Sequence, residues 1–169
     1  LVLVCPSPRY IDDLPGYVGG FSRAGIQALL ETMDLNYLGW AAGMGPAIMA
    51  NGDRPELGKE LADSFCSTDP LIARRFAEAT FLSDNRADLP QVRVPSLILQ
   101  CREDIVAPEA VGRYMHAHLP NSTLALLDAT GHCPHMSAPD ETVRAMRAYL
   151  GLSTPAAGDR AVRMLAPIA

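Results

Sequence analysis

The sequence lacks the features of several protein classes. No apolar stretch approaches the roughly 20 residues that a membrane-spanning helix needs, so we expect no membrane partner. The 14 basic residues form no cluster and the net charge is −5, which argues against nucleic acid as a partner. The opening LVLVCPSP has neither the basic start nor the length of a signal peptide, and we therefore expect a cytoplasmic protein.

The four cysteines are spaced far apart, with no C-x-x-C pair among them. They are Cys5, Cys66, Cys101 and Cys133. This spacing favours buried, reduced thiols over a disulfide framework or a zinc knot.

Histidines give the only other hint of a metal site. The candidate ligands are His116, His118, His132, Cys133 and His135. Residues two apart on a helix point about 200° apart, so His116 and His118 are poorly placed to share one ion. We expect no metal and no cofactor.

What the sequence does contain is an ordinary globular composition, 49% apolar and 20% charged. Residues 1–8 are predicted to form a core strand that is buried on both faces over positions 1–4. Residues 9–85 show helical spacing, with helix starts at Ser22, at Asp53 before Pro55, and at Asp69. We interpret this segment as an all-helical insertion.

Residues 86–150 form a second unit of alternating strands and helices. The pattern predicts strands over 94–101 and 122–128, with a helix over 108–119 between them and a last helix over 139–150. Strand, helix, strand is the parallel crossover unit, so the fold class is α/β. The tail, 151–169, stays unassigned.

Two loops follow the carboxyl ends of these strands. One carries Asp104 in REDIVAP and the other carries His132 in GHCPHMSAP. Because parallel strands end at one rim of the sheet, the two side chains are expected to meet there. An Asp that orients a His is two-thirds of a nucleophile–His–Asp triad, in the chain order that α/β-hydrolases use. The alternative is a turn-forming Asp and an unrelated loop His.

These residues carry a family resemblance. SPRYIDD, GYVGGF, NYLGWA, LILQCREDIVAP and GHCPHMSAPDET resemble the carboxyl-terminal part of α/β-hydrolases of the RsbQ stress-signalling type and of the plant strigolactone and karrikin receptors. The resemblance implies that Asp104 is the triad acid, that His132 is the base, that His135 is structural, and that residues 9–85 form a cap. It also implies an apolar ligand pocket lined by Phe21, Leu29, Trp40, Phe81 and Ile105.

The triad's nucleophile is missing, because the chain has no G-x-S-x-G motif. Ser22 in GFSRA comes closest, but no buried strand leads into it, and a helix cap explains it better. Cys133 follows the proposed base in a loop and is an unsuitable nucleophile. The chain also begins with Leu inside an apolar run, so we expect a fragment that associates with an amino-terminal half or with itself.

Two functions remain open. The first is a serine-type hydrolase of small apolar ester or lactone-like molecules, inactive without the missing half. The second is a small-ligand receptor that uses the same pocket with little turnover and recruits a signalling protein.

Overall fold

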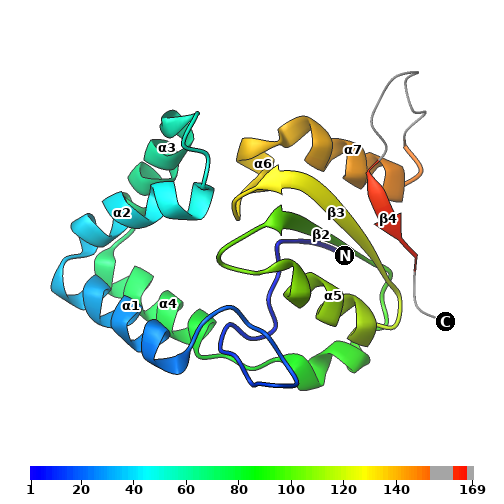
Figure 1. Cartoon of the computed structure of the whole chain (residues 1–169), viewed down its shortest axis with the longest axis horizontal. Helices are drawn as coiled ribbons and strands as arrows, with labels where there is room; N and C mark the ends of the chain where they lie inside the picture. The colour runs from blue at the N-terminus through cyan, green and yellow to red at the C-terminus, as the bar shows by residue number, and fades with distance from the viewer. Residues whose placement is uncertain (153–161, 167–169) are drawn as a thin grey trace.

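The computed structural model describes residues 1–152 and 162–166, and Figure 1 shows two groups of elements. One group is a four-stranded sheet of β1 (Val2–Val4), β2 (Ser96–Glu103), β3 (Ser122–Thr130) and β4 (Arg163–Leu165). The first three strands run parallel and β4 pairs antiparallel with β3. The parallel α/β unit that the sequence predicts is therefore confirmed.

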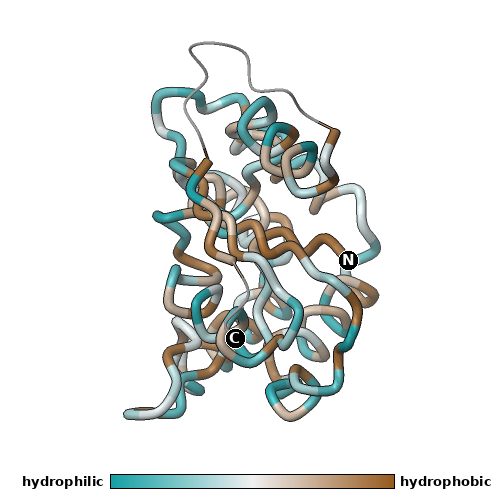
Figure 2. The backbone as a smooth tube through the Cα atoms, turned by 90° about the vertical axis from the view of Figure 1, so that its right-hand side faces the viewer, coloured by the Kyte–Doolittle hydropathy of each residue, from teal (hydrophilic) through white to brown (hydrophobic). Residues whose placement is uncertain are grey.

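Helices cover both faces of this sheet (Figure 1). On one face lies α5 (Glu109–His118), and on the other lie α6 (Pro134–Ser137) and α7 (Pro139–Tyr149). Leu97 and Leu99 point to the α7 side, while Ile98 points to the α5 side, and all three are fully buried. This alternation explains why Leu97–Leu99 form a continuous apolar run within β2, and Figure 2 shows the strands in the middle of the protein mostly in the brown of apolar residues.

The second group contains α1 (Arg23–Leu35), α2 (Tyr37–Met49), α3 (Pro55–Cys66) and α4 (Pro70–Phe81). The short 3-10 helix η1 (Arg86–Gln91) follows in the chain and packs against α5, in the first group. The Ser22 hydroxyl caps α1 by accepting a hydrogen bond from the Gly25 N–H at 3.0 Å, and Asp69 caps α4 in the same manner. Asn36 ends α1 and begins α2. The residue pattern alone did not separate these two helices.

The two groups meet at the loop between β3 and α6. The His132 N–H donates to the Ile48 carbonyl at the end of α2 (2.9 Å), and Asn51 Nδ2 donates to the Thr130 carbonyl (3.0 Å). Between them, Gly131 has φ +89 and lies so close to Met49 that an added Cβ would fall 2.0 Å from its carbonyl oxygen. The loop and the end of α2 are therefore in direct backbone contact.

One expectation about the core was wrong. The first strand was predicted to be buried on both faces, but Val2 and Val4 are each 37% exposed. Within the described residues β1 pairs with β2 alone, so its other edge and part of its faces lie open. The tail, left unassigned, contributes β4, while residues 153–161 and 167–169 lie outside the described part of the chain.

None of the helices within the described ranges combines the length and apolarity that crossing a bilayer would need.

The contact at Gly131 gives a first prediction. Gly131→Ala should lower the free energy of unfolding by at least ~3 kcal/mol, because it adds a clash with backbone to the ~1–2 kcal/mol strain of a left-handed residue. Gly151→Ala is the matched control, since Gly151 has φ +68 and an added Cβ there would meet none of the described residues within 4 Å, so this variant should show the strain alone. Urea unfolding measures both, and equal losses would contradict the close approach.

Candidate active site

Asp104 lies just beyond β2, in a turn that its own carboxylate stabilises. Oδ1 accepts hydrogen bonds from the N–H groups of Val106 (2.8 Å) and Ala107 (3.0 Å). The other oxygen, Oδ2, is 2.8 Å from Nδ1 of His132. The Asp104 side chain is wholly buried, whereas that of His132 is 23% exposed. The carboxylate is thus fixed by backbone and points one oxygen at the imidazole.

His132 reaches this position because of the glycine before it. The left-handed conformation of Gly131 reverses the chain after β3, and the Gly131 N–H donates to the Glu103 carbonyl at 2.7 Å. That bond ties the loop after β3 to the end of β2, and Asp104 is the next residue. The predicted meeting of the two loops at one rim is therefore what the structure shows.

The pair is arranged for proton transfer. A carboxylate at Nδ1 stabilises the tautomer that carries its proton there, which leaves Nε2 free to accept a proton from a nucleophile. Ser22, the weak alternative nucleophile, is occupied as the cap of α1. His135, in the same loop, is exposed and belongs to the short helix α6.

An apolar cavity of about 540 Å³ lies between the helices and the sheet and includes His132 in its wall. Four of the five pocket residues expected from the resemblance line it: Phe21, Leu29, Trp40 and Phe81. Ile105 does not belong to the wall; its side chain is 54% exposed, and Val106 takes the inward place at 6%. The reason is the turn at Asp104, which directs residue 106 inward and residue 105 out.

Part of the cavity wall was not predicted. Tyr10, Met44, Ile48 and Phe65 line the cavity, and none of them was expected there from the sequence. Met44 and Ile48 lie one helical turn apart on α2, following Trp40 by four and eight positions, so helical spacing from Trp40 could have found them.

Of the residues considered from the sequence as metal ligands, His132 alone belongs to a group of potential ligand atoms within the described residues. Among the described residues, one group of three potential ligand atoms lies close together, and it joins Asp104 and His132 with Cys5. His116 instead contacts the Ser122 hydroxyl at 3.0 Å, and His118 contacts the Tyr114 carbonyl at 2.7 Å.

Cys133 is unsuited to nucleophilic attack, as the sequence indicated. Burial raises the pKa of its thiol to about 11, with smaller contributions from Cys5 and Asp104. The reactive thiolate is therefore scarce at neutral pH.

Alkylation should reflect these differences in burial. At neutral pH, iodoacetamide should modify the exposed Cys66 while Cys5, Cys101 and Cys133 react only after unfolding. Peptide mass spectrometry over time measures each site. Labelling of Cys133 at a rate similar to that of Cys66 would contradict the buried position.

Relatives of known structure share this arrangement of elements. A hydrolase from Oleispira antarctica matches 90% of this chain and 56% of its own, with a TM-score of 0.86 and 41% identity. An esterase from Exiguobacterium antarcticum matches with a TM-score of 0.81 at 21% identity, which shows the fold alone.

Two curated proteins with similar sequences are named as esterases. A probable esterase of Oryza sativa subsp. japonica is 37% identical over 142 residues, which are 83% of this chain and 52% of the relative. A strigolactone esterase of Pisum sativum is 35% identical over 140 residues, 82% of this chain and 52% of the relative. The chain spans about half the length of these curated relatives.

The model of the alpha/beta hydrolase family matches residues 1–145. Because that match covers far more than half of the chain, this protein belongs to the alpha/beta hydrolase family.

Proposed function

We propose that this chain supplies the acid, the base and the ligand cavity of a serine-type hydrolase acting on small apolar ester or lactone-like molecules. The observation that carries the proposal is the Asp104–His132 hydrogen bond of 2.8 Å beside an apolar cavity whose wall includes His132. The names of the relatives, an esterase among them, support the same reaction class.

The proposed reaction follows from the positions of the two nitrogens of His132. A serine attacks the ester carbonyl while Nε2 of His132 takes its proton, and the imidazolium then returns a proton to the leaving alkoxide. Asp104 holds Nδ1–H throughout and stabilises the positive charge. In the second half of the cycle the same nitrogen activates water, which releases the acid and restores the serine.

The serine is proposed to come from an amino-terminal half that packs along the open edge of β1. Val2 and Val4, partly exposed there, would become buried by a further parallel strand. Residues 9–85 are proposed to act as the cap over the cavity, and the protein is proposed to work in the cytoplasm.

The cavity favours a ligand with one acceptor oxygen in an otherwise apolar body. Phe21, Phe65 and Phe81 contribute rings to its wall, and Trp40 lies 5.4 Å from Phe65 between ring centroids. Within the described residues, the buried indole N–H of Trp40 has no hydrogen-bond partner. A carbonyl or ether oxygen of the ligand could accept from it and so remove the cost of an unpaired buried donor.

Hydrolysis of a p-nitrophenyl ester by the complete protein tests the proposal. His132→Ala should lower kcat/KM by at least ~10³-fold, because the serine loses its base. His135→Ala, an exposed histidine three residues away, is the matched control and should retain nearly the full rate. Retention of most activity by His132→Ala would remove this residue from the mechanism.

A receptor is the second candidate function, and the direct contact between the His132 loop and α2 favours it. A movement of His132 caused by chemistry or ligand binding would displace Ile48, because their backbones share a hydrogen bond. One relative, 34% identical, is named a karrikin insensitive receptor of Petunia hybrida. Under this proposal the protein binds a small apolar ligand and recruits a signalling partner, as in stress signalling of the RsbQ type.

Counting product molecules separates the two functions. A hydrolase should release many products per protein with excess ester, whereas a receptor of this kind should stop near one and bind its partner only with ligand present.

A further inference from the structure

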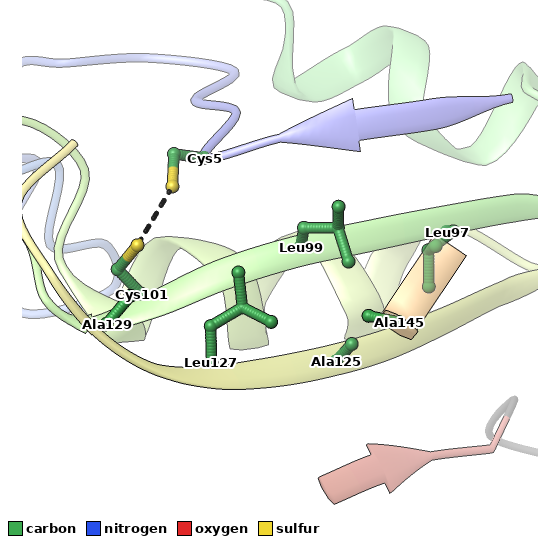
Figure 3. Packing of buried hydrophobic residues seen from close by; sticks show 8 residues of the cluster. All are labelled: Cys5, Leu97, Leu99, Cys101, Ala125, Leu127, Ala129 and Ala145. Carbon is green, nitrogen blue, oxygen red and sulfur yellow. Dashed lines mark hydrogen bonds between the residues drawn. The ribbon is translucent and has the colours of Figure 1, made fainter. Parts of the chain in front are cut away.

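Cys5 occupies an unusual position directly after β1. Its φ of +44 lies in the left-handed region, which residues with a Cβ rarely adopt. Its N–H donates to the Leu99 carbonyl at 2.8 Å, so the conformation is held by the neighbouring strand. The thiol is 2% exposed, and Figure 3 shows it pointing towards Cys101, with the two sulfurs 3.6 Å apart.

The same sulfur lies beside the catalytic pair. Sγ of Cys5, a carboxylate oxygen of Asp104 and a ring nitrogen of His132 all lie within 4.8 Å of one another. Each residue follows one of three neighbouring parallel strands, so the sheet itself brings them together. Thiolate, carboxylate and imidazole are the ligand types that zinc prefers.

The distances between these three atoms would fit a small ion after shifts of about 1 Å or less. Ligand atoms held 2.0–2.3 Å from a tetrahedral zinc ion are about 3.3–3.8 Å from each other. Asp104 Oδ2 and His132 Nδ1 are 2.8 Å apart and would separate by about 0.5 Å to admit the ion. The Cys5 sulfur lies within 4.8 Å of both and would approach by up to about 1 Å.

We propose that Cys5, Asp104 and His132 bind a divalent cation of the zinc group, Zn²⁺ or Cd²⁺. The ion enters from the cavity whose wall includes His132, and its fourth position stays open towards that cavity. Binding releases the proton of the Cys5 thiol to solvent, and the proton on Nδ1 of His132 moves to Nε2, so that the imidazole stays neutral when Nδ1 binds the ion. The thiolate and the Asp104 carboxylate together neutralise the charge of the ion.

An occupied site would stop acid–base chemistry, because the metal takes the Nδ1 lone pair and the carboxylate that the base requires. This consequence rests on the proposed hydrolase function, whereas metal binding itself does not. The ion is thus proposed as an inhibitor of the site and not as its catalyst.

Cadmium titration tests the site without any activity assay. In the complete protein carrying Cys66→Ser, which removes the exposed thiol, Cd²⁺ should produce the ultraviolet thiolate-to-cadmium charge-transfer band, and Zn²⁺ should displace it. Cys5→Gly should weaken Cd²⁺ binding by at least ~100-fold, more than the loss of an outer-shell partner costs. Glycine suits φ +44, so this variant should fold normally, as circular dichroism can verify.

Two further variants define the ligand set. Cys101→Ser removes the neighbouring buried thiol and should leave the affinity near its starting value, whereas Asp104→Asn should weaken it. Absence of the band, its persistence in Cys5→Gly, its loss in Cys101→Ser, or an unchanged affinity in Asp104→Asn would each overturn the proposed site.

Ester hydrolysis provides the second measurement. Zn²⁺ should slow the unmodified protein and leave Cys5→Gly unaffected. A protein that binds Cd²⁺ through Cys5 but hydrolyses no ester would retain the metal site and lose the proposed function, so the two failures can be told apart.

Discussion

The hydrogen bond between Asp104 Oδ2 and His132 Nδ1 joins the loops that follow β2 and β3, and both groups of elements meet around it. On one side, two backbone N–H groups donate to the other carboxylate oxygen, so the position of Asp104 is fixed independently of His132. On the other side, Gly131 reverses the chain and presents the imidazole to the cavity. A group oriented in this way loses little entropy when it acts, which is the usual benefit of preorganisation in catalysis.

The same loop carries the contact with the helices. His132 uses its ring towards Asp104 and its backbone N–H towards Ile48, and Gly131 fits against Met49 with no room for a side chain. Any ligand that separates the helices from the sheet must therefore disturb the residue that would perform the chemistry. Under the two proposed functions, this coupling would allow one architecture to serve either as a hydrolase or as a ligand-dependent switch, and the rate of product release would set the balance.

Residue patterns could predict much of this arrangement, because the relevant physics is local or follows from topology. The apolar run of β2, the caps at Ser22 and Asp69, and the rule that parallel strands end at one rim led to the Asp104–His132 pair. The open face of β1 could not be foreseen, since burial depends on which strands lie beside it. Ile105 was predicted to lie in the cavity wall, but Val106 lies there instead, because the turn at Asp104 sets the side-chain directions. Hydropathy alone does not reveal such a turn.

The cysteine near the site was missed for a similar reason: Cys5 stands far from Asp104 and His132 in sequence, and only the sheet order brings them together.

The most direct test of the proposed acid–base pair is the tautomer of His132, read from ¹⁵N chemical shifts of its ring in the complete protein. The Asp104–His132 hydrogen bond predicts that neutral His132 carries its proton on Nδ1 and that Asp104→Asn shifts the population away from that form. A proton on Nε2, or a tautomer indifferent to Asp104→Asn, would contradict it.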